Sequence, residues 1–113
     1  MGVGYCHCAS CKKISGGIGT ASGGVAVEAI HILEGRDLLR TYQPEEGSAK
    51  TFCSVCGTNL FGGGWPDRPT ASVRLSAIDD QFDEKPTRHI FVRSVAPWEA
   101  LPDDGLDRFD ERP

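Results

Sequence analysis

The sequence contains no apolar run long enough to cross a membrane. A membrane-spanning helix needs roughly 18 or more consecutive apolar residues, and polar or charged residues interrupt every stretch of that length. Residues 1–4 also lack the charged region and following apolar region of a secretory signal peptide. We therefore expect neither a membrane span nor a membrane partner, and we take the cytoplasm as the default location.

Positive charge is in short supply as well. Lys and Arg number 12 against 16 Asp and Glu, which gives a formal net charge of −4. Nucleic-acid-binding domains carry a basic face that neutralises phosphates, so the composition argues against a general nucleic-acid binder. The glycines form no dinucleotide-binding loop either, because Gly17-Ile18-Gly19 is followed by Ser22 where that motif requires its third glycine.

What the chain does contain is a series of short segments with the residue pattern of β-strands. It has 14 Gly and 7 Pro, which indicates many turns. Residues 70–78 alternate best, with Ala71 and Val73 predicted to point inward and Ser72 and Arg74 outward. Short strands at roughly ten-residue spacing predict an all-β fold with few or no helices, in a single domain over residues 1–113. The expected strands cover residues 3–6, 18–29, 30–33, 38–43, 50–52, 58–61, 70–78 and 88–92.

All five cysteines fall into two short clusters. Cys6, Cys8 and Cys11 form a C-x-C-x-x-C pattern, and Cys53 and Cys56 form a C-x-x-C pair. Such spacing lets a tight turn direct two or three sulfurs at one point. Zn²⁺ is the ion that such thiolates usually hold, at about 2.3 Å per Zn–S bond. All five cysteines are therefore candidate metal ligands, for one or two zinc ions.

Three other uses of these cysteines have to be weighed. An odd number of thiols does not suit a framework of disulfides. A thioredoxin-like redox pair requires a βαβ context, which the sequence does not show. Ordinary buried cysteines would not be expected to fall into two such clusters. Unpaired cysteines of the metal-binding type also favour a reducing compartment, in agreement with a cytoplasmic location.

Two arrangements of the metal ligands remain open. Cys8, Cys11, Cys53 and Cys56 can form one four-thiolate site, which is coordinatively closed and serves the fold, with Cys6 left over. Alternatively, the three cysteines of the first cluster hold an ion by themselves. Its fourth position is then open to water or to a substrate thiolate.

Polar residues within and beside the first cluster are candidates for supporting roles. Lys12 and Lys13 follow it directly, where they would lower the pKa of the thiols electrostatically; an exposed, solvated turn is an equally good interpretation. His7 lies between two candidate ligands. A lone histidine carries little information, so a neutral ring that is packed or faces solvent is preferred over a catalytic acid or base.

These motifs, in this order, resemble a known family. The segments 6–13, 52–61, 89–92 and 96–98 are similar to those of the glutathione-dependent formaldehyde-activating enzyme family, also called the centromere protein V-like domain family. The resemblance covers nearly the whole chain. It implies a zinc-bearing, Mss4-like arrangement of folded β-sheets with zinc-binding hairpin turns.

The resemblance also implies an activity and a division of the cysteines. The named enzyme of the family is a carbon–sulfur lyase that joins formaldehyde and glutathione into S-hydroxymethylglutathione. By similarity, Cys6, Cys8 and Cys11 correspond to a zinc site linked to catalysis, and Cys53 and Cys56 to half of a four-cysteine structural site. Family members supply the other half from a Gly-x-Cys-x-Cys-Gly strand, and no cysteine precedes the first cluster here.

Two functions of different classes follow. The first is an enzyme acting on a small thiol adduct, in which a three-thiolate zinc holds the substrate while Lys12 and Lys13 attract a carboxylate such as those of glutathione. The alternative is a non-catalytic, zinc-stabilised module that binds a partner through Trp65 and Trp98, although Trp98 is more simply predicted to cap the core. A methionine sulfoxide reductase is set aside, because it would need a cysteine after Cys56.

Overall fold

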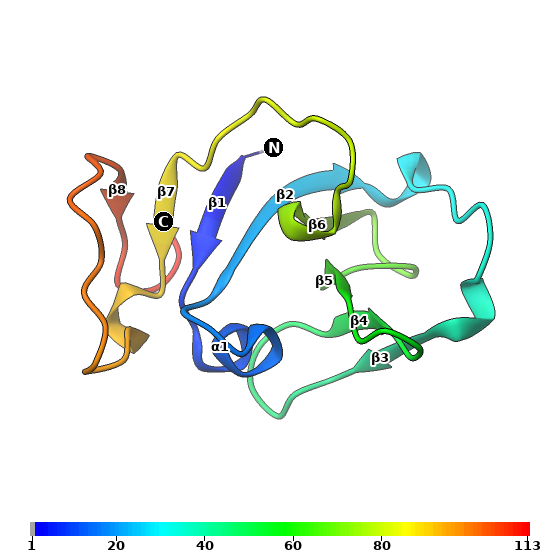
Figure 1. Ribbon diagram of the computed structural model, residues 1–113, viewed down its shortest axis with the longest axis horizontal. Helices are drawn as coiled ribbons and strands as arrows, with labels where there is room; N and C mark the ends of the chain where they lie inside the picture. Colours follow the sequence, from blue (N-terminus) through cyan, green and yellow to red (C-terminus); the bar gives the residue numbers. More distant parts are fainter. Residues whose placement is uncertain (1) are drawn as a thin grey trace.

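The computed structural model describes residues 2–113. Their strands form one eight-stranded sheet in the order β3-β4-β5-β6-β2-β1-β7-β8 (Figure 1). Neighbouring strands are antiparallel, except that β7 runs parallel to both β1 and β8. The prediction of an all-β fold with few helices is confirmed. The strands are β1 Val3–Cys6, β2 Thr20–Ala26, β3 Leu39–Tyr42, β4 Lys50–Cys53, β5 Asn59–Gly62, β6 Thr70–Arg74, β7 Arg88–Ile90 and β8 Asp107–Arg108.

The one α-helix in residues 2–113, α1 over Ala9–Ser15, is absent from the sequence-based prediction. The sulfur of Cys8 caps its start by accepting a hydrogen bond from the backbone N–H of Cys11 at 3.4 Å. The helix ends at Gly16, which has a left-handed conformation and donates its N–H to the carbonyl of Lys12. Within the described part of the chain, no helix is long and apolar enough to span a bilayer.

Several predicted strands are shorter in the structure or absent: the strand of residues 18–29 ends at Ala26, and that of residues 88–92 ends at Ile90. Residues 30–33 belong to no strand, and Leu33 is 94% exposed. They lie in the connection between the 3₁₀ turns Val27–Ala29 and Arg36–Leu38, so they lack the cross-strand pairs that stabilise β-structure. β6 ends at Arg74, and the predicted extension to residue 78 is instead mainly a third 3₁₀ turn, Leu75–Ala77.

The pairing of the central strands separates an apolar face from a polar one. Val73 pairs with Phe61 on the first face, where Ala71 is buried as predicted. Successive side chains point to opposite faces, so Arg74, which pairs with Ser22, lies on the second. Arg74 was expected to point into solvent, but only 5% of its surface is exposed. The prediction was wrong because this second face lines a cavity.

Gly19 holds the start of β2 tightly against the end of β1. It has φ +152°, and a Cβ built there would overlap the carbonyl oxygen of Cys6. We expect Gly19→Ala to lower the free energy of unfolding by about 2 kcal/mol or more, because backbone atoms must move to admit the methyl group. Urea denaturation measures this, with Gly17→Ala as the matched control, since a Cβ there meets only the Ser15 hydroxyl at 3.8 Å. Equal losses in both variants would contradict the assignment.

Candidate metal centre and its cavity

Cys6, Cys8 and Cys11 are brought together at the junction of β1 and α1. β1 ends at Cys6, Cys8 caps the helix, and Cys11 is buried in its first turn. Their three sulfurs all lie within 4.8 Å of one another. Three soft thiol ligands at this spacing fit a zinc ion, because small shifts of the side chains bring all three sulfurs to Zn–S distance.

The three thiols also interact with one another through their hydrogens. The pKa of Cys8 lies far below the usual range for a thiol, mainly because the thiols of Cys11 and Cys6 hydrogen-bond to its sulfur. The pKa of Cys6 is raised by the same contacts, since hydrogen bonds to Cys11 and Cys8 hold its proton in place. Cys8 therefore becomes a thiolate, the form that binds metal, more readily than Cys6 does.

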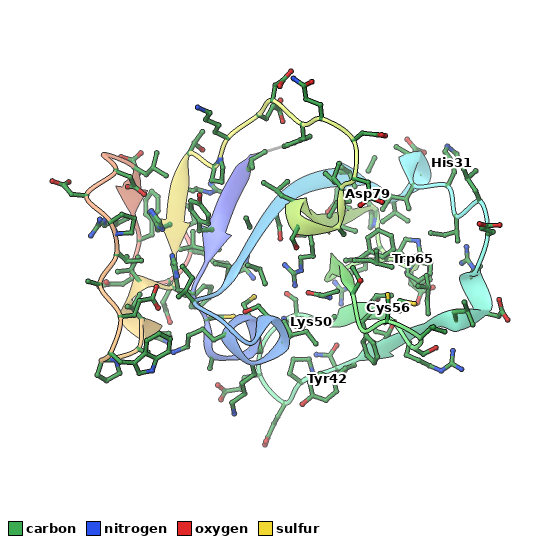
Figure 2. All side chains as sticks on the ribbon, viewed as in Figure 1. His31, Tyr42, Lys50, Cys56, Trp65 and Asp79 are labelled. Carbon is green, nitrogen blue, oxygen red and sulfur yellow. The ribbon has the colours of Figure 1, made fainter. Side chains whose placement is uncertain are left out.

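Cys53 and Cys56 lie at the tip of the hairpin formed by β4 and β5, and the Cys56 side chain is exposed (Figure 2). Gly57 has φ +77°, as predicted for a turn that closes directly after the C-x-x-C pair. The pKa of Cys56 is lowered, chiefly by a hydrogen bond with the hydroxyl of Thr58 at 3.1 Å.

The two clusters do not converge on one point. Among residues 2–113, the only group of three or more potential metal ligands is the first cluster. The single four-thiolate site that the sequence allowed, from Cys8, Cys11, Cys53 and Cys56, is thus not formed. A separate metal ion on Cys53 and Cys56 stays a prediction.

Lys12 and Lys13 make contacts with groups other than the thiols. The ammonium group of Lys12 donates a hydrogen bond to the carbonyl of Ser94. Lys13 is exposed and lines a different cavity, which it shares with Tyr42 and Pro44. A second cavity opens beside the three thiols, and neither lysine lines it. Their role in binding a carboxylate therefore stays a prediction.

A cavity of about 500 Å³ opens beside the three thiols and extends over the polar face of the sheet. Its lining combines all three cysteines of the cluster with glycines and serines of β1, β2, β5 and β6. The charged side chains around it are mostly basic, although the whole chain is acidic. They are Lys50, Arg74, Arg88, Arg93 and Arg112, with Glu46 as the acidic exception.

His7 belongs to a buried hydrogen-bonded chain on the other side of β1. Its Nδ1–H donates to the carbonyl of Ile18 at 3.0 Å, and its Nε2 lies 2.8 Å from Nδ1 of His89. His89 in turn donates from Nε2 to the Asp104 carboxylate at 2.8 Å, and Tyr5 stacks on its ring. The pKa of Asp104 is lowered mainly by this hydrogen bond from His89.

The surroundings of His7 agree with the preference for a packed ring. It is 1% exposed and does not line the cavity beside the thiols. Its partner His89, and Asp104 beyond it, were not predicted as part of the site. No local pattern could have identified them, because the hydrogen bond between the two histidines joins residues 82 positions apart.

Comparison with known proteins adds one finding. A family model described as glutathione-dependent formaldehyde-activating enzyme matches residues 1–94. The matched range includes all five cysteines and both histidines of the buried chain, and it stops before Asp104. A search of curated proteins found no matching relative.

Proposed function

Because the chain belongs to the glutathione-dependent formaldehyde-activating enzyme family, we propose that it is a zinc-dependent carbon–sulfur lyase acting on adducts of an aldehyde and a small thiol such as glutathione. Formaldehyde and S-hydroxymethylglutathione are the expected pair of aldehyde and adduct. A reducing compartment such as the cytoplasm suits the free thiols. The observation that carries the proposal is the convergence of three sulfurs at the mouth of a cavity large enough for such an adduct.

The proposed reaction needs no oxidant or further reactant. In the joining direction, the thiol sulfur bonds to the aldehyde carbon, the π electrons of the carbonyl pass to oxygen, and the thiol hydrogen ends on that oxygen. Cleavage reverses these changes. A zinc ion on the three cysteines would supply an open fourth position in which a substrate thiol loses its proton readily.

The protein's own residues contribute position and surroundings. Cys8, with its lowered pKa, is readily available to a metal as a thiolate. The burial of Cys11 keeps bulk water from one side of the cluster, and the cavity leaves the other side open to substrate. An ion at this point would therefore be held from the helix side and approached from the cavity side.

The alternative, a zinc-stabilised module that binds a partner without chemistry, has one observation in its favour. Trp98, predicted to cap the core, is instead 74% exposed, and large exposed aromatic residues are common anchors of interfaces. Trp65 is less available, because it packs on Phe61 and lies under the guanidinium of Arg36.

Metal analysis and turnover together test the proposed activity. We expect protein purified without chelator to hold about one equivalent of zinc or more, with at least three sulfur ligands on an ion by X-ray absorption. We also expect it to accelerate formation of S-hydroxymethylglutathione, followed by NMR with ¹³C-labelled formaldehyde. Zinc below about half an equivalent with all five thiols titratable would contradict metal binding. Full zinc without acceleration would favour the binding module.

A further inference from the structure

Two basic side chains in the cavity are buried without an acidic partner. Lys50 is 2% exposed and Arg74 is 5% exposed. In the described part of the chain, the ion pairs are His89 with Asp104 and Arg93 with Glu111, so neither buried cation is paired. Removing a charge from water without a counter-charge is costly. The cavity therefore favours a negative group beside these two cations, and no described carboxylate lies within ion-pairing distance of either one.

Both cations retain unused hydrogen-bond donors. The ammonium group of Lys50 has three donors, and its one hydrogen bond within residues 2–113 goes to the carbonyl of Ser48 at 2.7 Å. The guanidinium of Arg74 is fixed through Nε by Asn59 at 2.8 Å, and through Nη1 by the hydroxyls of Ser22 at 2.7 Å and Thr20 at 3.1 Å. Its Nη2 makes no hydrogen bond to the described residues. The guanidinium is thus held in position while one edge stays free.

The register of the sheet places these cations on the same face as Cys6. Gly62 lies on β5, the strand between those that carry the two cations. It pairs with Lys50 on β4 and with Ser72 on β6. A Cβ on Gly62 would lie 3.0 Å from Nη2 of Arg74, so the absence of a side chain leaves room beside the guanidinium. The floor between the thiols and the cations is built mainly from glycine and serine.

The distance from the guanidinium to the thiol cluster suits one small molecule. Thr20, which accepts a hydrogen bond from Arg74, pairs directly with Cys6 across β2 and β1. Paired strands lie about 4.8 Å apart, so a ligand that contacts both Arg74 and the sulfurs has to bridge roughly one to two strand spacings.

We propose that Lys50 and Arg74 form a carboxylate-binding subsite, so that the substrate is a thiol carrying an acidic group a few bonds from its sulfur. The assignment of the sulfur end rests on the proposed function above. The free edge of a guanidinium matches the two oxygens of a carboxylate, and an ammonium beside it adds a charge-assisted hydrogen bond. The acidic thiol bridges the cluster and the cations across the glycine floor.

The test measures binding of S-methylglutathione, which has carboxylates but no free thiol, by calorimetry on the purified protein. We expect Lys50→Met to weaken its binding about ten- to hundredfold, the loss typical of a hydrogen bond to a charged group. Arg74→Gln should act similarly. Lys85→Met is the matched control: it removes the same charge from an exposed lysine outside the cavity, and it should change binding less than about twofold.

Each outcome decides the question. Loss of binding in Lys50→Met and Arg74→Gln but not in Lys85→Met, with a melting temperature of Lys50→Met no lower than wild type, supports the subsite. Equal binding by all four proteins overturns it, as does a comparable loss in Lys85→Met. Binding of S-methylglutathione that depends on Lys50, without acceleration of adduct formation, would sink the proposed lyase and leave the subsite standing. Full turnover with an unchanged KM in Lys50→Met would overturn the subsite and leave the proposed lyase activity supported.

Discussion

Replacing Cys11 with alanine is expected to weaken zinc binding by well over about a hundredfold, because losing even an outer-shell partner of a metal ligand costs about 10- to 100-fold. Cys11 is the buried member of the cluster, and its sulfur lies within 4.8 Å of the other two. Two thiolates hold the ion less tightly than three, because water has to take the place of the lost thiolate. Competition with a chromophoric chelator gives the affinity directly.

Cys56→Ala is the control for this measurement. It removes a thiol of the other cluster that is exposed and outside the group of converging sulfurs. The affinity of the tightest site should therefore stay within about threefold of wild type. If Cys56→Ala weakened that site as much as Cys11→Ala, the two clusters would share one ion in solution, and the open three-thiolate site would have to be given up.

The second large effect is expected from His89→Ala, which should lower the free energy of unfolding by about 2–4 kcal/mol. The substitution removes a buried ring that hydrogen-bonds both His7 and Asp104. It leaves a cavity under Tyr5 and a buried nitrogen of His7 without a partner. Urea denaturation followed by circular dichroism measures the loss.

The chain provides its own control in His31, the remaining histidine, which lies exposed in the connection before β3 (Figure 2). His31→Ala should change the free energy of unfolding by less than about 0.5 kcal/mol, as is usual for exposed positions. A loss of similar size in both variants would show that the buried chain of hydrogen bonds does not stabilise the fold.

The sequence was sufficient for the parts of the molecule that depend on local pattern. The cysteine spacing of residues 6–11 predicted a cluster, and the structure brings these sulfurs together. The hairpin of residues 50–61, with Gly57 in a left-handed turn, was also predicted correctly. Both features are contained in short segments whose geometry follows from turn chemistry and alternation.

The rest depended on contacts between distant segments. Alternation correctly assigned Arg74 to the face opposite Ala71, but it could not show that this face is covered and lines a cavity. The residues that continue the hydrogen-bonded chain beyond His7 come from β7 and from the loop before β8. Helix α1 was missed because its start is capped by a cysteine sulfur instead of the usual hydroxyl or carboxylate.

The closeness of the three cysteines in sequence has a consequence for folding. β1 lies in the interior of the sheet. It pairs with β7 through Tyr5 and His89, and this pairing requires the ends of the long segment between the two residues to come together. Residues 6–11, by contrast, can wrap an ion before any strand has paired. An ion that also binds the unfolded chain stabilises the native state by less than its affinity implies. Zinc on this cluster should therefore raise the melting temperature only modestly, even where it binds tightly.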